Sequence, residues 1–398
     1  MSDAISISVA VWAEALVGPH TGTRTVLENL INYTERSGLH HVTYTLACPS
    51  WVDPHRLKAR FPTNNVRVVS VRGRRWKNRL LWLAGGASIS RDIGRHDIYV
   101  SGWHWPLGGR DRPFLGILHD LRMLDPAWND PTVSVLRRIL WRTLLDLSVR
   151  VCLSRASAVV VPSQYTLDHL VRLGYKSRLM PSIIPHGVDH EFWSFKACDS
   201  ELESTLERIG ADPKRDFVLS VGQHTPHKNF RRLITGFSEA LGQGETQAQL
   251  IIVGGENVQT LELCRLIDEH GMKKSVVLAG TVSQNDLRVL MGRARVFAFP
   301  SLFEGFGLPV LEAFAAGVPV VTSNSTSLAE IAKGAALLVD AEDSSEIGRA
   351  LMLAWRDETV RKDLLECASK RARAYTWERA VEHYLQVFAA IAERREMR

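Results

Sequence analysis

The 398-residue sequence is poor in cysteine, and its few cysteines are scattered. There are five of them, an odd number, and no two form a C-x-x-C pair, so the sequence indicates neither a disulfide framework nor a zinc site. We therefore expect a reducing, cytoplasmic location. The chain also lacks an apolar run of about 18 residues and a basic leader segment, which argues against a membrane span and a signal peptide. If the protein contacts a membrane, we expect it to bind at the membrane surface.

Neither sign of charge dominates the sequence. Lys and Arg number 49 and Asp and Glu 43, which leaves a net charge of +6 with His neutral and favours an anionic partner. No nucleic-acid-binding motif accompanies the scattered positive charge, so we do not expect nucleic acid to bind. Residues 72–83 and 136–142 combine arginines with large apolar residues, as a helix on an anionic membrane face would. Solvated helices with buried apolar sides explain that composition equally well.

The sequence is rich in short β-branched runs that alternate with longer helical patterns. This alternation predicts parallel sheets with helices on both faces. The strands expected in the first half are 5–12, 42–48, 66–71, 97–101, 114–119 and 158–162. Those expected in the second half are 217–222, 249–254, 276–279, 296–300, 318–322 and 336–339.

The two sets of strands predict an α/β chain with two doubly wound domains. We expect a first domain over 1–190, a charged linker without a strand over 191–215, and a second domain over 216–376. Apolar residues at helical spacing predict that 377–398 forms a closing helix, which should pack back on the first domain. Ligands of such sheets bind beyond the carboxyl ends of the strands, so we expect the site in a cleft between the domains.

The most informative segment follows strand 296–300 and reads Glu304-Gly-Phe-Gly-Leu-Pro-Val-Leu-Glu312. Its glycines allow backbone to approach a ligand, and Pro309 suits the first turn of a helix. The N–H groups and positive dipole end of that helix would form an anion site suited to a diphosphate. Two carboxylates beside it could accept hydrogen bonds from sugar or ribose hydroxyls. An ordinary helix after a glycine-rich loop is the plainer alternative.

These residues resemble the retaining glycosyltransferases of family 4, which have the GT-B fold of two Rossmann-like domains facing a cleft. Their E-x7-E pattern is matched by Glu304 and Glu312. The resemblance implies that Glu304 contacts the donor sugar and that Glu312 binds the nucleotide ribose. It also implies that the amides between them hold sugar and diphosphate, namely those of Gly305, Phe306, Gly307 and Leu308.

A second segment, from Gly222 to Lys228, follows strand 217–222, and its lysine could reach a phosphate as a flexible point charge. The resemblance implies that Lys228 binds the donor diphosphate. The family usually has an arginine one residue after the glycine, where this chain has Gln223. Either a protonated His227 supplies the second cation, so that donor affinity rises as the pH falls, or Lys228 and the helix dipole suffice. Val282 is expected near the base.

In the first domain, His119 and Asp120 match the family's H-D step after a central strand. The resemblance implies that His119 touches the donor sugar and that Asp120 lies close to the acceptor hydroxyl. Gly22 and Thr23 match part of a glycine-rich loop near the diphosphate, although a capped helix start explains them as well. Trp103, His104 and Trp105 could form a surface on which an acceptor sugar stacks. Packing in the core explains the two tryptophans equally well.

The resemblance implies a retaining hexosyltransferase with His119, Asp120, Lys228 and Glu304 as catalytic residues. No D-x-D motif occurs, so we expect neither a metal nor another cofactor. The motifs resemble bacterial polysaccharide mannosyltransferases, which favours GDP-mannose as donor and a glycan or lipid-linked acceptor, with peripheral contact to the inner membrane face. A UDP-glucose-dependent transferase and a sugar-nucleotide epimerase are alternatives. A binding protein without activity is disfavoured by the intact Glu pair.

Overall fold

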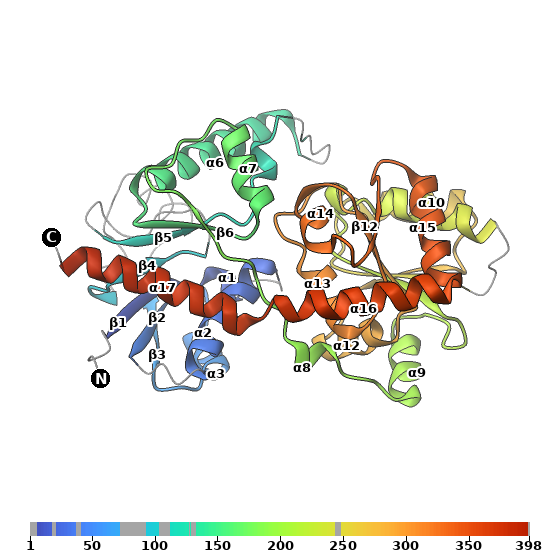
Figure 1. The fold of residues 1–398 in the computed structure, drawn as a ribbon, viewed down its shortest axis with the longest axis horizontal. Coiled ribbons are helices and arrows are strands. Elements are labelled where there is room, and N and C mark those ends of the chain that lie inside the picture. The colour runs from blue at the N-terminus through green and yellow to red at the C-terminus, as the bar shows by residue number, and fades with distance from the viewer. Residues whose placement is uncertain are drawn as a thin grey trace. The chain divides into compact units, whose positions relative to one another are not determined.

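The computed structural model describes residues 6–17, 21–36, 41–71, 93–102, 112–126, 128, 133–242 and 248–396. The chain divides into two compact units (Figure 1). Unit 1 comprises Met1–Asn129, Val133–Gly187 and Trp377–Arg398, and unit 2 comprises Asp130–Thr132 and Val188–Thr376. The main boundary thus follows Gly187. Residues 191–215, the expected linker, belong to unit 2 and hold most of α8 (His190–Trp193) and all of α9 (Asp199–Arg208).

Unit 1 contains a seven-stranded parallel sheet with the order β3-β2-β1-β4-β5-β6-β7. All six predicted strands are present. The seventh, β7, has only two residues and was not predicted, because no apolar run marks it in the sequence. Their bounds are β1 (Ile7–Trp12), β2 (Val42–Pro49), β3 (Val66–Val71), β4 (Ile98–Val100), β5 (Phe114–Ile117), β6 (Ala158–Val161) and β7 (Ser182–Ile183). The order reverses between β1 and β4, which is the switch point of the sheet.

Helices flank the sheet of unit 1 because its strands are apolar on both faces. They are α1 (Glu14–Val17), α2 (Gly22–Arg36), α3 (Pro54–Arg60), α6 (Val135–Arg155), α7 (Gln164–Arg172) and the short 3₁₀ turn η1 (Arg122–Leu124). The predicted closing helix is confirmed as α17 (Trp377–Glu396), which packs on α2, β1 and β4. Its Tyr384 and Phe388 are among the largest fully buried side chains.

Unit 2 contains a six-stranded parallel sheet with the order β10-β9-β8-β11-β12-β13. Its strands confirm the six predicted in the second half of the chain. Their bounds are β8 (Phe217–Val221), β9 (Gln249–Val253), β10 (Val276–Gly280), β11 (Val296–Phe299), β12 (Val320–Ser323) and β13 (Leu337–Val339). Here the order reverses between β8 and β11. Both units therefore have the doubly wound topology that was predicted from the alternation of β-branched runs with helical patterns.

The remaining helices of unit 2 connect these strands. They are η2 (Pro226–Lys228, 3₁₀), α10 (Phe230–Gly242), α11 (Thr260–Glu269), α12 (Gln284–Arg293), α13 (Leu308–Ala316), α14 (Thr326–Ala332), α15 (Ser344–Arg356) and α16 (Glu358–Ala374). One core cluster joins α10, α11 and α15 to the strands through residues such as Phe237, Ile252 and Trp355. Among the described helices, none is long and apolar enough to cross a bilayer.

Candidate active site

Two neighbouring strands of unit 2, β8 and β11, end side by side at the switch point of the sheet. The buried Ser220 hydroxyl donates to the Ala298 carbonyl at 2.6 Å and ties the two strand ends together. The loops that follow are joined as well, because the Leu302 N–H donates to the His227 carbonyl at 2.8 Å. The sequence motifs that begin at Gly222 and at Glu304 lie on these two loops, at the edge where doubly wound sheets bind ligands.

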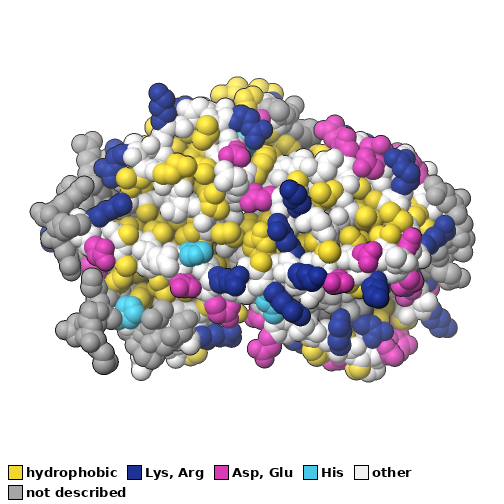
Figure 2. All heavy atoms as spheres, in the orientation of Figure 1, with side chains coloured by type: hydrophobic (Ala, Val, Ile, Leu, Met, Phe, Trp, Pro, Cys, Tyr) yellow, Lys and Arg dark blue, Asp and Glu magenta, His cyan; other side chains and the backbone are white. Residues whose placement is uncertain are grey.

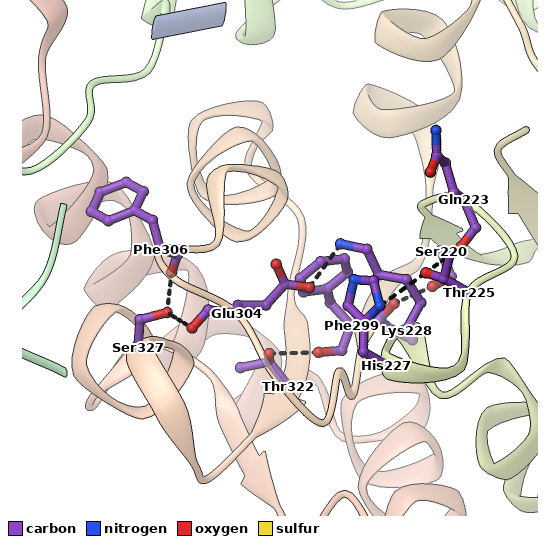
Figure 3. Close-up of polar contacts among 11 residues, drawn as sticks. Ser220, Gln223, Thr225, His227, Lys228, Phe299, Glu304, Phe306, Thr322 and Ser327 are labelled. Carbon is purple, nitrogen blue, oxygen red and sulfur yellow. Dashed lines mark hydrogen bonds and ion pairs between the residues drawn. The ribbon is translucent and has the colours of Figure 1, made fainter. Parts of the chain in front are cut away.

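An ion pair joins the two loops. The Lys228 Nζ atom lies 2.7 Å from Glu304 Oε1 and 4.6 Å from the centroid of the Phe299 ring (Figure 3). Both charged side chains are only 15% exposed. An ammonium group has three N–H donors, and Glu304 uses one of them. Lys228 is thus held in one place while it retains donors for a ligand oxygen.

The backbone around Lys228 explains why its side chain takes this position. A Cβ atom at Gly222 would lie 3.0–3.1 Å from three carbons of the Lys228 side chain, so glycine provides the space in which the lysine lies. Asn229 follows in the left-handed conformation, with φ of 61°. Its buried side-chain amide donates to the carbonyls of Pro300 and Ala341 at 2.9 and 2.6 Å. Asn229 was not identified from the sequence, although asparagine is among the residues most tolerant of that conformation.

The loop from Glu304 to Gly307 is held by the start of α14. The Ser327 hydroxyl lies 2.9 Å from the carbonyl oxygens of both Glu304 and Phe306 (Figure 3). In a trans peptide the carbonyl and the next N–H point in opposite directions, so the N–H groups of Gly305 and Gly307 face away from Ser327. Ser327 could not be identified from the sequence, because nothing distinguishes it from the neighbouring Ser323 and Ser325.

Gly307 caps helix α13. Its φ is 112°, and a Cβ atom there would lie 2.6 Å from the Leu328 side chain. Both the conformation and the space therefore require glycine. Leu308 and Pro309 follow in the first turn, as the sequence predicted. The N–H groups of this first turn of α13 lie at the end of the loop from Glu304 to Gly307.

Glu312 lies one turn into α13 and is half-buried. Burial raises the pKa of its carboxyl group to about 7. No side chain or backbone group among the described residues donates a hydrogen bond to it. A carboxylate in this position can accept hydrogen bonds from hydroxyl groups of a ligand.

The other residues of unit 2 near the two loops do not all lie at the Lys228–Glu304 pair. His227 Nδ1 lies 3.0 Å from the Thr225 hydroxyl, and Gln223 points away from Lys228 and Glu304 (Figure 3). Val282 follows β10, which is two places from β8 in the sheet, so it lies away from that pair. Gly254 has a packing role, since a Cβ atom there would lie 1.7 Å from the Gly222 carbonyl oxygen.

In unit 1, the structure brings His119 and Thr23 to one edge of the sheet through Gly102. The His119 Nε2–H donates to the Gly102 carbonyl at 2.8 Å, and Gly102 lies against Thr23 and Leu27 of α2, whose first residue is Gly22. Burial lowers the pKa of His119, partly opposed by the Gly102 carbonyl and by Asp120. The ring is therefore neutral at pH 7, and its Nδ1 can accept a hydrogen bond.

Asp120, the neighbour of His119, is exposed, and its carboxylate accepts a hydrogen bond from the Arg122 N–H at 3.2 Å. The proposed stacking residues Trp103, His104 and Trp105 lie outside the described residues, as does segment 72–83. Within the described ranges, no group of three or more His, Cys, Asp or Glu side chains is placed to hold a metal ion.

Family models match both halves of the chain. The Glycosyltransferase Family 4 model matches residues 20–192, and the model for Glycosyl transferases group 1 matches residues 203–372. O-antigen chain mannosyltransferase B of Escherichia coli is 30% identical over 172 residues, 43% of this chain and 45% of that protein. Serotype-specific mannosyltransferase WbdA of Escherichia coli is 28% identical over 241 residues, 60% of this chain and 29% of that protein. The chain spans half or less of the first curated relatives it matches.

The fold has close counterparts among solved structures. The crystal structure of Anabaena HepE in complex with UDP and glucose has a TM-score of 0.70 at 19% identity, over 96% of this chain and 100% of that one. The similarity to the solved structure shows the GT-B fold, and the family models show the similarity in sequence. Both point to glycosyltransferases. The chain therefore belongs to the family 4 type of GT-B glycosyltransferases.

Proposed function

We propose that the protein transfers mannose from GDP-mannose, with retention of the anomeric configuration, to a glycan or lipid-linked oligosaccharide in polysaccharide or lipopolysaccharide synthesis. One observation carries the proposal: at the switch point of unit 2, the Lys228–Glu304 pair joins the segment after β8 to the loop that leads into α13. A positive side chain, a helix N-terminus and two carboxylates suit the diphosphate and the hydroxyl groups of a nucleotide sugar.

Each residue then has a defined task. Lys228 and the N-terminus of α13 bind the diphosphate, Glu304 contacts the sugar, and Glu312 accepts hydrogen bonds from the ribose. His119 offers its unprotonated Nδ1 to a sugar hydroxyl. Asp120 lies close to the acceptor hydroxyl.

The reaction needs little covalent chemistry from the protein. The bond between the anomeric carbon and the diphosphate oxygen breaks, and the acceptor oxygen attacks on the same face. The acceptor proton passes to the leaving diphosphate. Lys228 and the dipole of α13 stabilise the negative charge that develops on the leaving group. No step in this scheme requires a metal ion.

Mannose is proposed as the transferred sugar because the first curated relatives are named mannosyltransferases. The test is thermal unfolding in the presence of GDP-mannose, GDP, UDP-glucose and UDP, since a ligand stabilises the state that binds it. We expect GDP-mannose or GDP to raise the unfolding temperature most, with and without EDTA. A larger response to the UDP compounds would contradict the GDP-mannose assignment.

Lys228→Ala should abolish the shift, because a hydrogen bond to a charged group contributes about 1.5–3 kcal/mol, or roughly 10–150-fold in affinity. Lys214→Ala is the matched control, since Lys214 is exposed and precedes β8, at the opposite end of that strand from the site. Equal shifts in the two variants would contradict the assignment of Lys228. Turnover of a UDP-sugar without any acceptor would indicate an epimerase instead.

A further inference from the structure

Helix α6 of unit 1 exposes large apolar side chains along its first half. The exposed fractions of Val135, Leu136, Ile139, Leu140 and Trp141 are 61, 79, 57, 57 and 44%. No residue from 135 to 147 is buried. Single exposed apolar residues are common on protein surfaces, but a contiguous group of this size marks an interaction surface.

The second half of the same helix provides the packing that holds it in place. Ser148, Val149, Cys152 and Leu153 are buried, and Cys152 packs against Gly116 of β5, where a Cβ atom would lie 2.3 Å from the cysteine sulfur. In the first half, Leu145 is partly buried against the same core cluster, whereas the exposed apolar residues Val135, Leu136, Ile139 and Leu140 do not belong to it. Their apolar character calls for a different explanation.

Four of the five exposed apolar residues form one side of the helix, and Trp141 lies outside it. At about 100° per residue, Val135, Leu136, Ile139 and Leu140 fall within an arc of roughly 140°. Leu147, which is 46% exposed, continues this arc two turns later. Of the core residues of the second half, Val149 and Cys152 point in other directions on the helix, whereas Leu153 points in the direction of Val135. We call the side formed by Val135, Leu136, Ile139, Leu140 and Leu147 the apolar side of α6.

Arginines border the apolar side. By the same angular count, Arg137 falls beyond one border and Arg142 beyond the other. The helix contains five arginines and a single acidic residue, Asp146, which pairs with Arg150 at 2.9 Å. Arg137 is exposed. Figure 2 shows hydrophobic and basic side chains together along the upper edge of the molecule, where Figure 1 places α6.

We propose that the first half of α6 docks the protein on an anionic lipid bilayer. The apolar side would enter the boundary between headgroups and acyl chains, and the arginines would lie at the level of the lipid phosphates. A helix side of leucine, isoleucine and valine that is bordered by arginines has the composition expected for this position. The proposal concerns where the protein works and does not depend on which nucleotide sugar it uses.

A second copy of the chain is a less suitable occupant. Two copies that met through this side about a two-fold axis would bring the same residues together, including Arg137 of each copy. Like charges at such an interface disfavour association, whereas the phosphates of anionic lipids complement them. Charge complementarity therefore favours the bilayer.

Co-sedimentation of the full-length protein with vesicles tests the proposal. The vesicles contain phosphatidylcholine alone, or phosphatidylcholine with about a third phosphatidylglycerol, in the absence of nucleotide. We expect binding to the anionic vesicles that weakens at high salt. The double substitution Leu136→Ser and Leu140→Ser should weaken binding at least tenfold, and Arg137→Glu at least fivefold.

Leu261→Ser is the matched control, because Leu261 is 69% exposed but lies on α11 of unit 2. It should bind vesicles as the unmodified protein does. All variants should keep the unfolding temperature of the unmodified protein, since the substituted side chains are exposed. The proposal is overturned by absent binding to anionic vesicles, or by equal binding of the α6 and α11 variants.

Sedimentation velocity without lipid tests the other occupant. Concentration-dependent dimers that the α6 double substitution abolishes would assign the surface to a second copy and would overturn the proposal. A monomer at all concentrations supports the bilayer. Because vesicle binding is measured without nucleotide, a failure of GDP-mannose to bind would contradict the proposed function alone.

Discussion

At the scale of single residues, the site is organised before any ligand arrives. Lys228 is fixed by Glu304 and by the ring of Phe299, and it retains donors for a phosphate oxygen. Glu312 differs, because no described residue satisfies its carboxyl group. The motifs of the sequence could identify both glutamates and the lysine. They could not foresee that Lys228 and Glu304 would pair with each other.

The raised pKa of Glu312, to which no described residue donates a hydrogen bond, leads to a prediction about pH and stability. Its pKa is raised from 4.5 to about 7 by burial, so the folded protein keeps a proton that the unfolded chain has lost. The contribution of this group to stability therefore falls as the pH rises from about 4.5 through 7, by up to about 3 kcal/mol. Glu312→Gln removes this dependence. Urea unfolding at pH 5 and pH 8 should show the variant gaining stability over the unmodified protein at the higher pH.

The exposed residue Glu342 provides a control for the substitution itself, since Glu342→Gln makes the same change from carboxylate to amide at the surface. A constant difference between Glu312→Gln and the unmodified protein at both pH values would contradict the raised pKa. The same variant should bind donor more weakly, because an amide is a poorer hydrogen-bond acceptor than a carboxylate.

At the scale of elements, the loop from Glu304 to Gly307 depends on α14. Ser327→Ala removes the hydroxyl that holds two carbonyl groups, which costs about 1–3 kcal/mol when they stay unsatisfied. Because those carbonyls orient the N–H groups at the start of α13, we expect donor affinity to fall about 5–50-fold. Isothermal titration with GDP-mannose measures the affinity.

Ser345→Ala is the control for this prediction. Ser345 also donates a hydrogen bond at a helix start, to Glu239 at 2.7 Å, but that bond is exposed and lies on α15. Its loss should change stability and affinity little. If Ser327→Ala lowered stability yet bound GDP-mannose as tightly as Ser345→Ala, Ser327 would be structural without positioning the loop.

The helices and strands could be predicted far better than the tertiary hydrogen bonds that hold their loops in place. Apolar β-branched runs identified the strands that carry the site, and Pro309 identified the start of α13. Asn229 and Ser327 were not identified, because each bonds backbone groups that are distant in the sequence, such as Ala341 for Asn229. Such bonds leave no periodic pattern. The short strand β7 likewise has too few residues to produce one.

At the scale of the whole molecule, the sequence could predict two doubly wound units, because short β-branched runs alternate with helical patterns in both halves of the chain. The main boundary after Gly187 lies close to residue 190, where the first domain was expected to end, but α8 and α9 are charged segments without a strand and were therefore expected to be a linker and not a part of unit 2. The assignment of α17 was possible because its apolar spacing is regular. The chain thus contributes its last helix to unit 1, although most of unit 1 precedes unit 2 in the sequence.

This arrangement predicts that α17 stabilises unit 1 without taking part in nucleotide binding. Phe388 is fully buried, and α17 packs on α2, β1 and β4. Phe388→Ala should therefore lower the free energy of unfolding by about 3–5 kcal/mol, whereas the exposed Gln386→Ala on the same helix should change it little. Because Lys228, Glu304 and Glu312 belong to unit 2, the folded Phe388→Ala protein should bind GDP with the affinity of the unmodified protein. Urea unfolding and titration with GDP measure the two quantities, and a loss of GDP affinity in Phe388→Ala would show that unit 2 depends on this helix.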